Sequence, residues 1–73
     1  MKKYFKVGDI VKYSEKWCRD EERHLIHVIR EDRSCDDEKF NRYLIETLNG
    51  RKYLGYLNST EDVFDYMIEL ANN

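Results

Sequence analysis

Apolar and polar side chains alternate in three segments within the first two thirds of the chain. The segments are residues 7–14, 23–31 and 40–48. A repeat of two predicts a strand, because successive side chains of a strand point to opposite faces. Both faces of 23–31 carry apolar side chains, which is typical of a strand covered on two sides. Gly8, near the start of the first segment, favours a bend or a bulge.

A hairpin signal follows the third segment. The dipeptide Asn49-Gly50 favours a type I′ turn, which needs residues that tolerate positive φ at both central positions. Residues 51–57 carry two tyrosines and two leucines beyond this turn, and they predict a fourth strand returning along 40–48.

The last part of the chain changes to a helical repeat. Residues 60–71 predict a helix whose apolar face has the 0, 3, 4, 7 spacing, formed by Phe64, Met67, Ile68 and Ala71. Ser59 or Thr60 is expected to cap its first free N–H groups. Asp65 and Glu69 are expected to point away from the core on an acidic outer face, with Tyr66 near the edge of that acidic face.

The segments between these elements are polar. Residues 15–22 surround the single tryptophan, Trp17, and predict a loop, with a helical turn as the alternative. Residues 32–39 predict a charged loop, because adjacent acidic side chains repel one another and disfavour burial. The fold class is therefore α+β, mostly β, and the whole chain, 1–73, is expected to form one domain.

The composition favours binding over catalysis. A chain of 73 residues has a small core and little room for a deep pocket that excludes water. Charged residues reach 38% and the net charge is −2, so few surface positions are neutral. We therefore expect no enzyme activity, and homodimerisation is a common way to stabilise a core of this size.

Cysteine usage and the lack of long apolar runs indicate the compartment. Cys18 and Cys35 are too few for a secreted disulfide scaffold, so reduced thiols are expected and a Cys18–Cys35 bridge is the alternative. No apolar run follows the basic start of the chain, and none approaches the ~20 residues of a membrane span. A cytoplasmic protein without a membrane segment is the expectation.

Two stretches of the chain resemble small SH3-like barrels. They are Phe5-Lys6-Val7-Gly8-Asp9-Ile10-Val11-Lys12-Tyr13 and Tyr43-Leu44-Ile45-Glu46-Thr47-Leu48-Asn49-Gly50, and the likeness spans roughly residues 5–58. Many such barrels open with an apolar residue, Gly, Asp, any residue and Val. The resemblance implies an SH3-like barrel, and a curved four-stranded antiparallel sheet with one C-terminal helix is the competing architecture.

The chain also departs from the individual barrel families. Ser14-Glu15-Lys16-Trp17 stands where ribosomal and transcription-factor barrels of the KOW kind have a glycine-rich turn. Only Trp17 is expected on a loop, whereas Tudor-like and chromo-like barrels use several aromatic residues there. The Ala-Leu-Tyr-Asp-Tyr-like opening of peptide-binding SH3 domains is missing, and a helix over 60–71 exceeds the single 3₁₀ turn typical of such barrels. The resemblance thus implies a fold but no ligand.

The loop that carries Trp17 is the main candidate site. A tryptophan among cations can dock in a protein groove or stack on a base, and the alternative is that Trp17 covers one end of the barrel. The acidic neighbours of Trp17 suit a protein partner better than phosphates. We therefore predict a contact surface on this loop, with two tyrosines of 51–57 beside it. Its residues are Tyr13, Trp17, Arg19, Arg23, Tyr53 and Tyr56.

The spacing of the other candidate residues does not support a metal site or a catalytic site. Cys18, His24, His27 and Cys35 have the residue types of a zinc site, but no Cys-x₂-Cys pair is present. In a strand over 23–31, His24 and His27 would face opposite sides. No EF-hand spacing marks the acidic loop, and nothing orients a cysteine as a nucleophile. No metal, cofactor or catalytic residue is predicted.

These observations predict a small non-catalytic module that binds another protein. Size and charge density alone also fit a mobile-element protein that inhibits a host machine. The alternative is a nucleic-acid-binding module whose basic stripe would be formed by Lys2, Lys3, Lys6, Lys12, Lys16 and Arg19. Such a stripe would give an affinity that falls steeply with salt.

Overall fold

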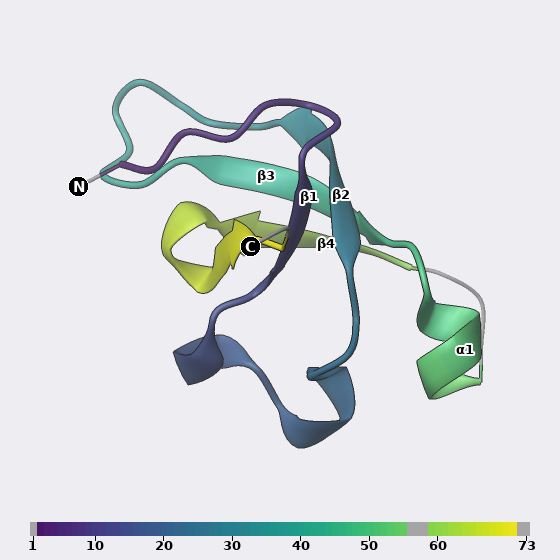
Figure 1. The fold of residues 1–73 in the computed structure, drawn as a ribbon. Coiled ribbons are helices and arrows are strands. Elements are labelled where there is room, and N and C mark those ends of the chain that lie inside the picture. Colours follow the sequence, from purple (N-terminus) through teal and green to yellow (C-terminus); the bar gives the residue numbers. More distant parts are fainter. Residues whose placement is uncertain (1, 56–58, 72–73) are drawn as a thin grey trace.

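A five-stranded antiparallel sheet forms the body of the protein (Figure 1). The computed structural model describes residues 2–55 and 59–71. The strands are β1 (Ile10–Tyr13), β2 (His27–Asp32), β3 (Arg42–Thr47), β4 (Thr60–Phe64) and β5 (Ile68–Leu70). Short helical turns connect them: η1 (Glu15–Trp17), η2 (Asp20–Glu22), α1 (Gly50–Leu54) and η3 (Asp65–Met67).

The order of the strands in the sheet is β4-β3-β2-β1-β5. The first four strands pair with their neighbours in sequence, and β5 then pairs with β1, so that Tyr13 lies opposite Ile68. The register between β2 and β3 shifts between Ile29 and Glu31. A bulge of this kind bends a strand and increases its twist.

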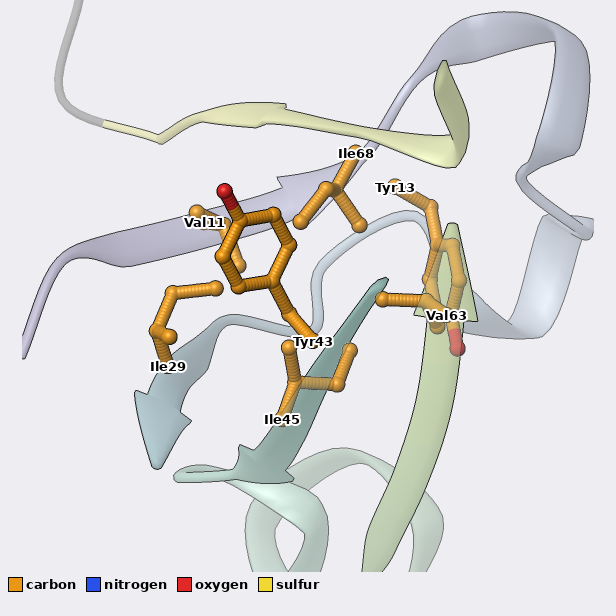
Figure 2. Packing of buried hydrophobic residues seen from close by; sticks show 7 residues of the cluster. All are labelled: Val11, Tyr13, Ile29, Tyr43, Ile45, Val63 and Ile68. Carbon is orange, nitrogen blue, oxygen red and sulfur yellow. The ribbon is translucent and has the colours of Figure 1, made fainter. Parts of the chain in front are cut away.

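The core lies on one face of this sheet and draws side chains from all five strands (Figure 2). Every second residue of β1 and β3 is buried, as the alternation predicts. Complete burial of one such side chain contributes roughly 1.5–3 kcal/mol relative to exposure. The cluster consists of Val11, Tyr13, Ile29, Tyr43, Ile45, Val63 and Ile68.

A buried carboxylate ties the N-terminal segment to the turn between β4 and β5. Asp65 is 0% exposed, and its Oδ2 accepts the backbone N–H groups of Lys3 at 2.8 Å and Asn41 at 3.0 Å. The Asn41 side chain donates to the Lys3 carbonyl at 2.8 Å, and the Tyr43 hydroxyl accepts the Phe5 N–H at 3.0 Å. Residues 3–5 are therefore held against the sheet without belonging to a strand.

The structure confirms that the chain is mostly β, and three strands lie where alternation places them. β1 and β3 fall inside 7–14 and 40–48, and β2 begins four residues later than the start of 23–31. Gly8 has φ of 98°, which suits a glycine, and its N–H donates to the Ile29 carbonyl at 2.9 Å. Residues 15–22 contain two 3₁₀ turns, so the helical-turn alternative describes them better than a plain loop.

The predicted hairpin of 40–48 with 51–57 is wrong. Asn49 has φ of −124°, so a type I′ turn does not form, and α1 follows it directly. The Asn49 side chain instead donates to the His24 carbonyl at 2.9 Å and accepts the Ile26 N–H at 3.0 Å. Part of the predicted strand, residues 56–58, lies outside the described residues.

The predicted C-terminal helix over 60–71 is also wrong. This segment forms β4, η3 and β5, which makes five strands instead of four. Its apolar spacing fits both structures, because η3 interrupts the extended chain and lets Val63 and Ile68 enter the core from two separate strands. β4 and β5 complete the sheet by pairing with β3 and β1. Asp65 is buried within this turn instead of pointing to solvent.

Replacement of the buried carboxylate should destabilise the domain strongly. Asp65→Ala leaves the Lys3 and Asn41 N–H groups without their acceptor, and each unsatisfied buried donor costs about 1–3 kcal/mol. We expect a loss of roughly 2–5 kcal/mol in the free energy of unfolding, measured by urea denaturation.

The matched control is Asp62→Ala, because Asp62 lies three residues away at an exposed position of β4, where its carboxylate pairs with Arg33. This variant should unfold at nearly the same urea concentration as the parent protein. Equal stability of the Asp65→Ala and parent proteins would contradict the role assigned to Asp65.

Candidate functional site

Four aromatic rings meet at the surface around Tyr66, and we call Trp17, Phe40, Phe64 and Tyr66 the aromatic surface. The Tyr66 ring centre lies 5.4 Å from that of Trp17, 4.8 Å from that of Phe40 and 5.6 Å from that of Phe64. The four residues come from η1, the loop before β3, the end of β4 and η3. Segments far apart in sequence thus supply one continuous set of rings.

The strand register explains how these rings reach the outside. Along β4 the buried Val63 faces the core, so its neighbour Phe64 takes the opposite face. Phe64 lies opposite Arg42 on β3, and the Arg42 guanidinium lies 5.5 Å from the centre of the Phe64 ring. The turn η3 follows at once and places Tyr66 beside Phe64, with their ring planes only 7° apart.

The rings remain partly accessible to solvent. Trp17 is 42% exposed, and Phe40, Phe64 and Tyr66 are each half-buried. The Tyr66 hydroxyl makes no hydrogen bond with any residue of 2–55 or 59–71. Aromatic rings with an unused hydroxyl at the surface present both apolar contact area and a hydrogen-bond donor.

Cations surround the aromatic surface. The Lys16 ammonium lies 6.0 Å from the Trp17 ring centre, and the Lys39 ammonium lies 5.5 Å from that of Phe40. The third cation, Arg42, pairs with Glu38 at 2.8 Å. Cation–π contacts at exposed sites contribute about 0.5–1 kcal/mol each, which orients these side chains over the rings.

A groove of about 350 Å³ runs beside Trp17, beneath the loop that joins β1 to β2. Tyr13, Trp17, Arg19, Glu22, Glu61 and Met67 line it. The Tyr13 hydroxyl donates to the Glu61 carboxylate, which links β1 to β4 across the inner face of the sheet. Burial, together with this carboxylate, raises the pKa of Tyr13 well above its ordinary value.

A buried histidine packs against Tyr13, one of the residues that line this groove. His27 is 3% exposed, its ring packs edge-on against Tyr13 at 5.2 Å, and its Nδ1 lies 3.1 Å from Thr47 Oγ1. Burial lowers the pKa of His27, and the Glu61 carboxylate opposes this effect. The neutral imidazole is therefore favoured in the folded protein.

Five of the six predicted contact residues are described, and they separate into three groups. Tyr13, Trp17 and Arg19 line the groove together, although Tyr13 is buried. Arg23 pairs with Glu15 at 3.2 Å and Asp20 at 3.1 Å, so its charge is already compensated. Tyr53 lies on α1, where its ring stacks on His24 at 5.4 Å. Tyr56 lies outside the described residues.

Sequence reasoning missed most of the aromatic surface. Phe64 and Tyr66 were expected on a helix, which would place them about 200° apart around its axis, whereas a strand ending in a turn brings their rings together. Phe40 was expected inside a strand over 40–48, whereas it lies just before β3. The sequence feature that could have indicated this surface is the presence of two aromatic residues, Phe64 and Tyr66, directly after the core residue Val63.

The zinc-type residues do not form a site. Within 2–55 and 59–71, no group of three or more His, Cys, Asp or Glu side chains is placed to hold a metal ion. Cys18 and Cys35 are free thiols, so the alternative of a bridge between them does not form. Burial raises the pKa of the Cys18 thiol, and a hydrogen bond with Glu38 raises that of Cys35, so both favour the protonated form.

Comparisons with known proteins add no relative. The chain matches no protein-family model, no curated protein and no solved structure. In the described part of the chain, none of the helices has the length and apolar character needed to cross a membrane.

The buried histidine should make the stability depend on pH. Because burial lowers the pKa of His27, the unfolded chain binds the proton more readily below about pH 6.5, and the folded state loses stability as the pH falls. We expect the urea midpoint to fall between pH 7.5 and pH 5.5. The fall should be smaller in His27→Gln.

His24→Gln is the matched control, because His24 is exposed beside Tyr53. This variant should keep the pH dependence of the parent protein. The same pH dependence in all three proteins would show that His27 is not buried in its neutral form.

Proposed function

We propose that this chain is a small non-catalytic module that binds another protein through the aromatic surface. The convergence of four rings around Tyr66 at the surface carries this proposal. Burial of these rings would stabilise the small core of a 73-residue domain, yet the rings remain partly accessible to solvent. They are Trp17, Phe40, Phe64 and Tyr66. Tyr and Trp are enriched at the energetic centres of protein interfaces, where their removal costs about 2 kcal/mol or more.

The arrangement of the rings favours a protein over a nucleic acid. Base stacking needs a free ring face, but Phe64 is covered by Arg42 on β3 and stacks on Tyr66. The exposed edges of such rings suit aliphatic and aromatic side chains of a partner.

The distribution of charge supports the same choice. Several cations are compensated by carboxylates, which reduces their contribution to phosphate binding. Within the predicted basic stripe, Lys12 pairs with Glu69 at 3.7 Å. The other compensated cations are Arg23, Arg30, Arg33 and Arg42.

For the fold we propose an SH3-like barrel. The long C-terminal helix, a departure from such barrels at the sequence level, is replaced by the three-residue 3₁₀ turn η3 between β4 and β5. The pairing of β1 with both β2 and β5, and the bond from Tyr13 to Glu61 on β4, support a curved sheet that approaches closure. A small module of this kind could inhibit a larger protein simply by covering part of its surface.

The test compares variants of the aromatic surface in quantitative capture of partner proteins. Trp17→Ala and Tyr66→Ala should each weaken capture at least tenfold, because removing an interface anchor costs about 2 kcal/mol. Tyr4→Ala is the control, because Tyr4 is 81% exposed and belongs to no ring contact of the aromatic surface.

Titration of Trp17 fluorescence with mixed-sequence oligonucleotides separates the two classes of partner. At low salt, where electrostatic binding is strongest, we expect no saturable change. A saturable change that disappears at high salt would replace the protein partner with a nucleic acid. Equal capture by all four proteins would overturn the aromatic surface as the contact site.

A further inference from the structure

Two of the three cations beside the aromatic surface form no ion pair with a carboxylate of the described residues. Lys16 and Lys39 lie over Trp17 and Phe40, and neither forms an ion pair with a described residue. Arg42 is the exception, because Glu38 compensates it. Two positive charges without an ion-pair partner in the described part of the chain therefore border the rings, in a protein whose net charge is −2.

Three carboxylates near Trp17, in sequence or in the groove, are already engaged. Glu61 accepts the Tyr13 hydroxyl, and Glu22 accepts the Arg19 backbone N–H at 3.2 Å. Both line the groove beside Trp17, away from Phe40. Glu15 pairs with Arg23. Glu22 and Glu61 thus lie on the groove side of Trp17 and Glu38 pairs with Arg42, whereas Lys16 and Lys39 lie over the rings without an ion pair to a described residue.

From this arrangement we infer that the aromatic surface takes an acidic segment of a partner protein, in which Asp or Glu alternates with large apolar side chains. The inference rests on the proposed function and adds the chemistry of the partner. Apolar side chains would contact the edges of the Phe40, Phe64 and Tyr66 rings, while carboxylates pair with Lys16 and Lys39. The Tyr66 hydroxyl can donate to a third carboxylate.

Complementary charge around an apolar centre is a common source of specificity. Opposite charges at the rim accelerate association and exclude partners of the wrong sign, while the buried apolar contacts supply most of the affinity. A basic segment would meet Lys16 and Lys39 directly, and like charges at close range disfavour binding. The geometry therefore selects among protein segments of similar hydrophobicity.

The test uses a random 12-residue peptide library displayed on phage. The library is selected on the immobilised full chain after removal of phage that bind Tyr66→Ala. We expect the recovered peptides to be enriched in Asp and Glu beside Leu, Ile, Phe or Trp. Enriched peptides that are basic or uncharged, yet depend on Tyr66, would overturn the acidic chemistry while leaving the proposed function intact.

Charge reversal then tests the two lysines with one selected peptide, made synthetically and titrated against Trp17 fluorescence. Lys16→Glu/Lys39→Glu should raise the Kd about tenfold, since exposed ion pairs contribute roughly 0.2–1 kcal/mol each and reversal adds repulsion. An increase in salt from 50 to 500 mM should weaken binding to the parent protein but not to this variant.

Lys52→Glu is the matched control. Lys52 also lies over an aromatic ring, at 5.3 Å from the centre of Tyr53, but on α1, which lies well apart from η3 (Figure 1). The Kd of the Lys52→Glu variant for the peptide should equal that of the parent protein. If Lys52→Glu raises the Kd as much as the double variant does, net charge alone explains the effect and the inference is overturned. Recovery of no Tyr66-dependent peptide would overturn both this inference and the proposed function.

Discussion

The Asp65 carboxylate is the constraint on which the rest of the structure depends. One oxygen accepts N–H groups from Lys3 and from Asn41, while the backbone N–H of Asp65 donates to the Asn41 carbonyl at 3.0 Å. These bonds fix the turn η3, and η3 determines where β4 ends and β5 begins. A charge buried in this way costs much free energy unless it is hydrogen-bonded, so the turn has few other conformations available.

The aromatic surface follows from the same turn. With η3 fixed, Phe64 leaves the sheet on the face opposite Val63, and Tyr66 stacks beside it. Trp17 and Phe40 approach Tyr66 from the two neighbouring loops, and they bring Lys16 and Lys39 with them. The same three-residue turn thus carries the buried Asp65 carboxylate and the Tyr66 ring. A change that disrupts η3 is therefore expected to affect both the stability of the domain and its proposed contact surface.

A second link, between the Tyr13 hydroxyl and Glu61, holds β1 near β4 and shapes the groove beside Trp17. Sequence reasoning grouped Tyr13, Trp17 and Arg19, which line this groove, from their positions at the end of the first predicted strand and on the loop that follows it. It did not find Glu61, because a helix over 60–71 would have placed that residue on an exposed N-terminal turn. Local patterns therefore identified the loop but not the strand that faces it.

The sequence by itself determined the early strands and the class of the fold, because alternation over 7–14 and 40–48 has a strand period and no competing helical repeat. Tertiary structure decided the rest. Asn49 bonds to the backbone at His24 and Ile26 instead of forming a hairpin turn, and the hydrogen bonds of Asp65 fix the turn that divides residues 60–71 into two strands. Both decisions depend on partners more than twenty residues away, and no local pattern of propensity or spacing contains that information.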